Sequence, residues 1–431
     1  MLATETKPAE DLAADAEKQP MRLPAEMRAF WLGTLVVLLL TLAAGWVKYR
    51  EGTSPYNWNP LSDRLFFDLD EYPGTYTLLH SSAFFNNIPD KPWPYPMWNP
   101  VAYPPFAAAV MAPLYAFRIP GLLYLIVAAA WLIAILTWAV RRLRRAGLSL
   151  KSSIGFPLTV IVLSFPIARL IHQGNIELVV WMLAALGVWA FWRGSNTAAA
   201  VLLGLAAAMK LFPIVLLALL LPRGRYRAFA VGIGTFVGAT VASLWWLGPS
   251  IGVAWRGSLH NVFFYQGRRM AELSLPSLAS NHSVGEMVKV AMFLAHGSPQ
   301  KMTLPYYASG AALLGFVFFK KLWKLPEANQ LLALSTFMVM LPTISYFHTL
   351  VHLYAPLAVL CALAIRAQKA GVTVPGLKTT MLLFLPLFAP FTVLNFPRLL
   401  MFCGLLQAVV LMALFLHAAE YPLELPGERG A

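Results

Sequence analysis

Acidic side chains concentrate in one polar stretch of the sequence, residues 48–100, where they could serve proton transfer. Six of the chain's 19 acidic residues lie there, against four basic ones. Within it, residues 66–72 read Phe-Phe-Asp-Leu-Asp-Glu-Tyr, so three carboxyls stand among large apolar side chains. Carboxyls crowded in this way have raised and separated pKa values, as a general base requires. The Asp-x-Asp spelling also occurs in metal–nucleotide sites, but the sequence shows no nucleotide-binding α/β domain, and we discount a metal here.

A second polar stretch, residues 248–302, is rich in arginine and histidine. Arginine forks match phosphate oxygens in pairs, so a site between the two stretches would combine an acid or base with an anion clamp. For any single residue in these stretches, the simpler interpretation is that it is charged because the loop is exposed to water, with no role in a site. The residues concerned are Arg256, His260, Arg268, Arg269, Glu272, Asn281, His282 and Glu286.

Ionisable residues also occur within or beside apolar segments, where they are costly and are functional candidates by default. Arg169 and Glu177 flank the sequence His-Gln-Gly-Asn, and Lys210 lies at a predicted helix break, although a snorkelling lysine is the alternative there. His348 and His352 are four residues apart, which predicts one helical face and is also a metal-ligand spacing. No third ligand is near them in sequence, so we expect no metal site.

Aromatic residues gather just before the second predicted span, at Trp93, Tyr95, Trp98 and Tyr103. Such residues form the aromatic belt at a membrane surface. They are also the side chains on which sugar rings stack. The sequence leaves both interpretations open.

Composition places these residues in a membrane protein. Of 431 residues, 59% are apolar and 12% are charged, which excludes a soluble globular domain and a disordered chain. The net charge of +14 comes from short basic runs beside apolar segments, around residues 141–145, 223–227 and 320–324. This is the positive-inside pattern of a membrane protein, and it argues against a nucleic-acid partner.

The hydropathy pattern predicts an all-α polytopic protein of about 12 helices. One short broken pair, residues 197–221, turns back at Lys210, Phe212 and Pro213. Residues 101–117, interrupted by prolines, are expected as a juxtamembrane helix in the first outer loop. The predicted spans are residues 30–47, 121–140, 154–172, 176–193, 228–247, 303–322, 329–346, 350–366, 377–396 and 399–417.

The same pattern predicts a single transmembrane domain, residues 28–419, between two tails. Residues 1–27 are expected as a flexible cytoplasmic tail and residues 420–431 as a cytoplasmic C-terminal tail. Residues 48–118 and 248–302 are expected as outer loops, because the first is net acidic and both lie opposite the basic runs.

Several short motifs follow one another in a familiar order. They are Asp68-Leu69-Asp70-Glu71-Tyr72, Tyr103-Pro104-Pro105-Phe106, Gly174-Asn175-Ile176-Glu177, the segment from Gly204 through Lys210 to Pro213, Asn281-His282-Ser283 and Ser345-Tyr346-Phe347-His348. In this order the chain, from about residue 60 to 360, resembles the bacterial polyprenyl-phosphate-mannose-dependent mannosyltransferases. These are integral-membrane enzymes of the GT-C fold, glycosyltransferase family 87.

The resemblance implies a transferase in the bacterial cytoplasmic (inner) membrane with its active site facing the periplasm. It implies a polyprenyl-phosphate sugar donor, usually carrying mannose, and a glycolipid or glycan acceptor. No cofactor and no metal are implied.

The family pattern also implies roles for individual residues. It has an aspartate four residues before a tyrosine, which assigns the catalytic base to Asp68, with Asp70 as the second choice. His348 matches the family's late histidine, although relatives often have Trp-Asp-His-His where this chain has Tyr-Phe-His-Thr at residues 346–349. The donor phosphate is assigned to Lys210, Arg256, Arg268 and Arg269, and substrate contacts to Tyr72, Tyr103, Asn175, Glu177, Asn281, His282, Tyr346 and His352.

The main alternative is a membrane transporter or flippase for a lipid-linked or small solute. A transporter should show repeated halves and charged or broken helices at the midplane. Here only Lys210 and its break fit that description. A lipid-linked glycan ligase or an arabinosyltransferase of the same fold is a further alternative within the enzymes.

Overall fold

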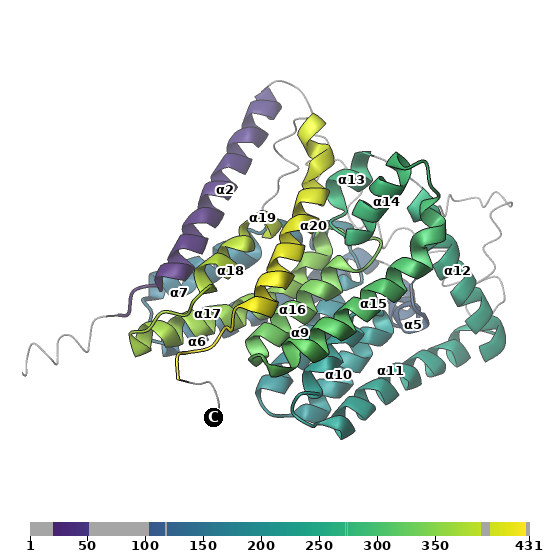
Figure 1. Ribbon diagram of the computed structural model, residues 1–431, viewed down its shortest axis with the longest axis horizontal. Helices are drawn as coiled ribbons and strands as arrows, with labels where there is room; N and C mark the ends of the chain where they lie inside the picture. The colour runs from purple at the N-terminus through teal and green to yellow at the C-terminus, as the bar shows by residue number, and fades with distance from the viewer. Residues whose placement is uncertain are drawn as a thin grey trace, which may run out of the picture.

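The computed structural model describes residues 20–50, 103–116, 119–271, 273, 275–388 and 397–427. Regular structure in these ranges is helical, apart from one isolated β-bridge between Met21 and Leu148. Five helices there are long and apolar enough to cross a membrane, or six if one bent pair forms a single span. The prediction of an all-helical, multi-pass membrane protein is confirmed (Figure 1).

The helices follow the predicted spans closely in the first half of the chain. They are α2 (Ala25–Arg50), α5 (Pro105–Met111), η2 (Ala112–Ala116), α6 (Pro120–Arg145), α7 (Leu150–Pro157), η3 (Leu158–Val162), α8 (Phe165–Gln173), α9 (Glu177–Trp192), α10 (Asn196–Met209), η4 (Phe212–Leu220) and α11 (Tyr226–Leu247).

The second half continues the bundle with shorter and more interrupted elements. They are α12 (Ile251–Ala271), α13 (Leu275–Ser280), α14 (Val284–Leu294), η5 (Pro299–Met302), α15 (Thr303–Lys320), η6 (Leu322–Lys324), α16 (Glu327–Met340), η7 (Phe347–Leu353), α17 (Tyr354–Ala370), α18 (Leu377–Leu383), α19 (Leu385–Phe388) and α20 (Pro397–Glu420).

The predicted helix break at Lys210 is confirmed. α10 ends at Met209, and Lys210 has an extended backbone with φ −143° and ψ 130°. Pro213 follows at the start of η4, and proline cannot continue a helix because it lacks the N–H and clashes with the preceding turn. η4 packs back against α10, so the chain returns toward the side from which α10 came.

Three predicted spans are less regular than expected. The span at 154–172 is bent by 51° between η3 and α8, where Pro166 begins the new helix. The span at 329–346 is helical only to Met340, and Pro342 follows in a non-helical segment. The span at 377–396 is cut at Phe384 into α18 and α19, and its last eight residues lie outside the described ranges.

Residues 248–302, expected as a loop, are largely helical. α12 alone has 21 residues, and α13, α14 and η5 follow it. From Ile251 to Phe263, large apolar residues recur at every fourth position of α12, which is a helical spacing.

The basic runs gather at one end of the bundle. Arg223 forms an ion pair with Glu327, which follows the Lys320 to Lys324 run. The Met21 N–H donates to the Gly147 carbonyl at 2.8 Å, next to the arginines that end α6. The side chain of Gln368, at the end of α17, donates to the Arg22 carbonyl. Helix ends such as Glu177 and Met209 therefore lie at the opposite end, because successive helices alternate in direction.

α10 and α11 approach each other through glycine. A Cβ at Gly204 would lie 2.4 Å from the Gly232 carbonyl oxygen, whereas a Cβ at Gly234 would meet nothing within 4 Å. The close approach helps to hold the broken element α10–η4 in place.

We predict that Gly204→Ala destabilises the protein, by about 1–3 kcal/mol for an overpacked contact, and lowers the apparent unfolding temperature in detergent. Gly234→Ala on α11 is the matched control and should unfold at the parental temperature or above, since alanine favours helix. Equal stability of the two variants would contradict the close packing of α10 on α11.

Candidate active site

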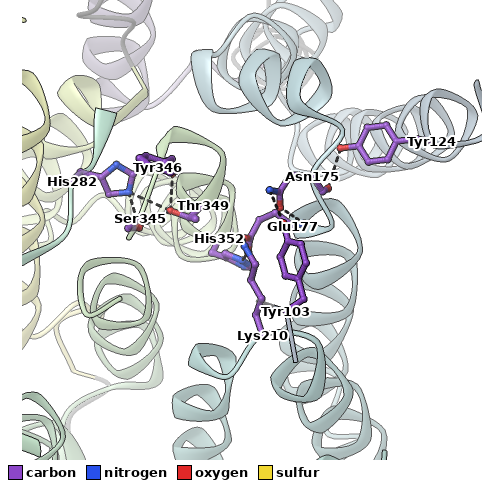
Figure 2. A network of polar contacts seen from close by, with 10 residues as sticks. All are labelled: Tyr103, Tyr124, Asn175, Glu177, Lys210, His282, Ser345, Tyr346, Thr349 and His352. Carbon is purple, nitrogen blue, oxygen red and sulfur yellow. Dashed lines mark hydrogen bonds and ion pairs between the residues drawn. The ribbon is translucent and has the colours of Figure 1, made fainter. Parts of the chain in front are cut away.

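A buried carboxylate, that of Glu177 at the first turn of α9, joins three elements at the end of the bundle opposite the basic runs. Its Oε2 is paired with the Lys210 ammonium, and its Oε1 lies 2.5 Å from His352 Nε2 (Figure 2). The side chains of Glu177 and His352 are 3% and 4% exposed, and that of Lys210 is 22% exposed. A buried carboxylate needs such partners, because an unpaired buried charge is strongly unfavourable.

The corner before α9 is fixed by local hydrogen bonds. Gly174 ends α8 with φ 65°, a left-handed conformation that glycine adopts without strain. The Asn175 Oδ1 then accepts from the Glu177 N–H at 2.9 Å, and the Asn175 Nδ2 donates to the Tyr103 hydroxyl at 3.3 Å. The Tyr124 hydroxyl donates to the Asn175 carbonyl at 3.2 Å. The side chain of Glu177 therefore starts from a rigid backbone.

The helix break gives Lys210 its direction. Its extended backbone frees the side chain from the end of α10, and its Nζ lies 5.9 Å from the centre of the Tyr103 ring. The ammonium thus turns inward to Glu177 and an aromatic face. This arrangement contradicts the snorkelling alternative.

His348 and His352 lie on η7, a 3-10 helix, so their four-residue spacing does not place them on a common α-helical face. His352 binds Glu177, and His348 is buried within electrostatic range of Lys210, Glu177 and Arg169. Among the described residues, no group of three or more His, Cys, Asp or Glu side chains could hold a metal ion.

A second polar cluster lies on the other side of η7 in Figure 2. His282 Nε2 is 3.0 Å from the Ser345 Oγ and 3.2 Å from the Thr349 Oγ1, and the two hydroxyls are 2.8 Å apart. Burial lowers the pKa of His282 to about 3, so this imidazole is neutral at neutral pH. The backbone N–H of His282 also donates to the Ser345 backbone carbonyl at 2.9 Å.

Asn281 supplies the non-helical segment 341–346 with hydrogen bonds that a helix would have made. Its Nδ2 donates to the Thr343 carbonyl at 2.9 Å, and its Oδ1 accepts from the Ser345 N–H at 2.8 Å. The Ser283 hydroxyl donates to the same Thr343 carbonyl at 3.1 Å. Two motifs separated by about 60 residues in sequence therefore form one folded unit.

A buried ion pair supports this unit. The Glu286 and Lys289 side chains are 2.7 Å apart and at most 3% exposed, and Asn281 donates to Glu286 Oε2 at 2.7 Å. The Lys289 Nζ also donates to the Arg269 carbonyl at 3.3 Å, and Gln266 on α12 is hydrogen-bonded to Thr343. The pair thus connects α12, α14 and the segment before η7.

Lys289, Tyr124 and Thr349 were not predicted for the site, and Glu286 was named in the second polar stretch without a role of its own. For Glu286 a signal existed, since Ser283 and Glu286 have the spacing of a helix capping box. The Ser283 Oγ indeed accepts from the Glu286 N–H at 3.0 Å. No comparable local signal marks the other three residues.

Most of the predicted site residues that the structure describes come together here. Tyr103, Asn175, Glu177, Lys210, His348 and His352 form one cluster, and Asn281 and His282 form the adjoining one. The Tyr346 ring lies 6.2 Å from His348, and its carbonyl accepts from Thr349.

The predicted arginines lie on α12. Arg256 is exposed, and its Nε donates to the Gly252 carbonyl at 3.3 Å. Arg269 is half-buried over the Tyr265 ring, 5.2 Å from its centre. Arg268 lies between them on the helix backbone, and Asp68, Asp70 and Tyr72 lie outside the described residues.

A family model for glycosyltransferase family 87 matches residues 102–345. This range begins one residue before Tyr103 and ends at Ser345, so it contains the two clusters apart from Tyr346 and the residues of η7. Comparison with curated proteins and with solved structures finds no match.

We predict strong coupling between Glu177 and Lys210 in a double-mutant cycle. Lys210→Met should cost roughly 3–5 kcal/mol, because it leaves a buried carboxylate short of its cation, and Glu177→Gln should recover much of that loss. Thermal unfolding of the purified variants measures the effect. Arg193→Met, at the opposite end of the bundle, is the control and should change stability little. Additive losses in the double variant would contradict a buried ion pair.

Proposed function

Because the chain belongs to glycosyltransferase family 87, we propose that it moves a hexose, mannose by preference, from a polyprenyl-phosphate carrier to a hydroxyl of a glycolipid or glycan. The transfer would take place on the periplasmic side of the bacterial inner membrane, with both termini in the cytoplasm. The family membership also favours a transferase over a transporter or flippase.

The observation that carries the proposal is the position and composition of the site. The two clusters lie at the helix ends remote from the basic runs, and basic runs face the cytoplasm by the positive-inside rule. A donor whose leaving group is a lipid phosphate is already in the membrane, so a site at helix ends can receive it directly.

The carboxylates of the described residues support a base from the first outer loop. At this end of the bundle the acids are Glu177 and Glu286, and each is paired with a lysine. A carboxylate that is the counter-ion of a lysine cannot take up a proton without leaving the charge of that lysine uncompensated. Every aspartate of the chain precedes residue 91, and we assign the base to Asp68, with Asp70 second.

The proposed reaction inverts the anomeric carbon. Asp68 takes the proton of the acceptor hydroxyl while its oxygen forms a bond to the anomeric carbon, and the bond from that carbon to the phosphate oxygen breaks. The polyprenyl phosphate leaves with the electron pair. Positive groups held near the phosphate stabilise it as this bond breaks.

Lys210 and the arginines of α12 are the proposed phosphate ligands. The ammonium of Lys210 has three donors, and the Lys210 side chain is 22% exposed, so part of this side chain remains accessible beside Glu177. Tyr103, whose ring faces this ammonium, is the proposed stacking surface for the sugar. Asn175, Asn281, His282, Tyr346 and His352 are assigned to binding or positioning of substrate, with Tyr72 from the first loop. His348 is assigned a catalytic role.

We predict that Asp68→Asn lowers transfer of labelled mannose from polyprenyl-phosphate-mannose to membrane lipid extract by about 10²–10⁴-fold, the usual contribution of a general base. Asp90→Asn, in the same acidic stretch, is the matched control and should retain activity. An arm with EDTA tests the metal-free mechanism and should leave transfer unchanged. Parental activity in Asp68→Asn would move the role to Asp70.

No transfer from any lipid-linked sugar by the parental protein, together with lipid or solute movement in proteoliposomes, would refute the transferase and support the transporter. Transfer that stops with EDTA would refute the metal-free mechanism alone.

We also predict that replacing both Arg268 and Arg269 by alanine weakens donor binding by roughly tenfold or more, since one hydrogen bond between charged groups contributes about 1.5–3 kcal/mol. Binding of the labelled donor to the purified protein measures this effect. Replacing Arg141 and Arg142 at the opposite end removes the same charge and is the control. Unchanged donor affinity in the first variant would refute the phosphate clamp.

A further inference from the structure

α12 exposes an apolar stripe although it is not among the candidate membrane spans. In the first thirteen residues of α12, every fourth residue belongs to the stripe: Ile251, Trp255, Leu259 and Phe263. These side chains are 43%, 48%, 37% and 64% exposed. Residues spaced by four lie along one side of a helix. A stripe of this size in contact with water would be unusual.

The other sides of α12 have different characters. Ala254, Ser258 and Asn261 are buried against the protein. Arg256 and His260 are exposed at one edge of the stripe, with Arg256 about 20° around the helix from Phe263, and Phe264, which is 38% exposed, lies beyond them. The first part of α12 thus has a protein side and an exposed apolar side that carries a charged edge, which suits a helix lying in a membrane interface.

The apolar stripe continues a surface that faces lipid. On α11, which is a candidate membrane span, Val237, Val241 and Trp245 are 48%, 45% and 72% exposed. α12 begins four residues after α11 ends and turns away from its direction at the right of Figure 1. A helix that turns in this way at the end of a span runs along the membrane surface rather than through it.

We propose that α12 lies in the outer interface of the membrane as an amphipathic helix. Its stripe is immersed about 5–10 Å, at the boundary between headgroups and acyl chains. Arg256 and His260 lie along its upper edge at the level of the lipid phosphates. The occupant of the stripe is the lipid surface itself.

This placement has a consequence for the site, which rests on the proposed function. α12 is tied to the segment before η7 through Gln266 and Thr343, and to α14 through Arg269 and Lys289. Immersion of the stripe therefore fixes the depth of the second polar cluster. The donor's phosphate would then arrive at the depth where Arg269 is held.

Site-directed spin labelling in proteoliposomes tests the placement. Single cysteines replace Trp255, Leu259 or Phe263 on the stripe, and Arg256 or His260 on the charged edge, in the full chain with Cys361→Ala and Cys403→Ser. Accessibility to oxygen, which partitions into lipid, is compared with accessibility to a water-soluble nickel chelate. We expect oxygen to exceed the chelate several-fold on the stripe and the order to reverse on the edge.

Two results would overturn the proposal. Chelate access at all five positions would show that α12 stands in water, and low access to both reagents on the stripe would show that protein covers it. The substituted positions are exposed, so folding should tolerate them, and size-exclusion chromatography in detergent identifies any that do not fold. The labelling pattern does not depend on transferase activity, so the two proposals can fail separately.

Discussion

The structure of the site depends on how the chain accommodates one buried carboxylate. Glu177 is removed from water at the end of a helix bundle, and its two oxygens are compensated by Lys210 and His352. Each of the three partners comes from a place where a regular membrane helix fails: the corner at Gly174, the break after Met209 and the 3-10 turn η7. The irregular backbone therefore makes the buried ion pair possible, since continuous helices would not bring these three side chains into contact.

Irregular backbone at membrane depth is tolerated only where protein covers it and satisfies its hydrogen bonds. The segment 341–346 meets this condition through Asn281, whose amide bonds both the Thr343 carbonyl and the Ser345 N–H. Glu286, which is paired with Lys289, accepts a hydrogen bond from Asn281 and so links α14 to this segment. Substrate groups can contact such a site without moving its backbone, because the polar atoms there are already oriented.

The sequence predicted the features whose causes are local. The break near Lys210 followed from Pro213, and the helical class followed from hydropathy. Pairing of His352 with Glu177 could not be predicted, because 175 residues separate them and no local pattern encodes the contact. The helix α12 was predicted as part of a loop because the stretch is rich in charged residues, including two adjacent arginines, although its apolar residues have a helical spacing. The aspartates at 68 and 70 lie outside the described residues, so their assignment remains a prediction.

Charge is divided between the two parts of the chain in a way that suits transfer from a lipid phosphate. The family match covers residues 102–345, where cations and imidazoles are fixed by buried contacts and the nearby carboxylates neutralise lysines. Six further acids lie just before that range, in residues 48–100. A site that held both on one rigid surface would pair them with each other, and each would lose the charge that its role requires. Separation keeps the positive groups available to a phosphate and leaves the proposed base able to accept a proton.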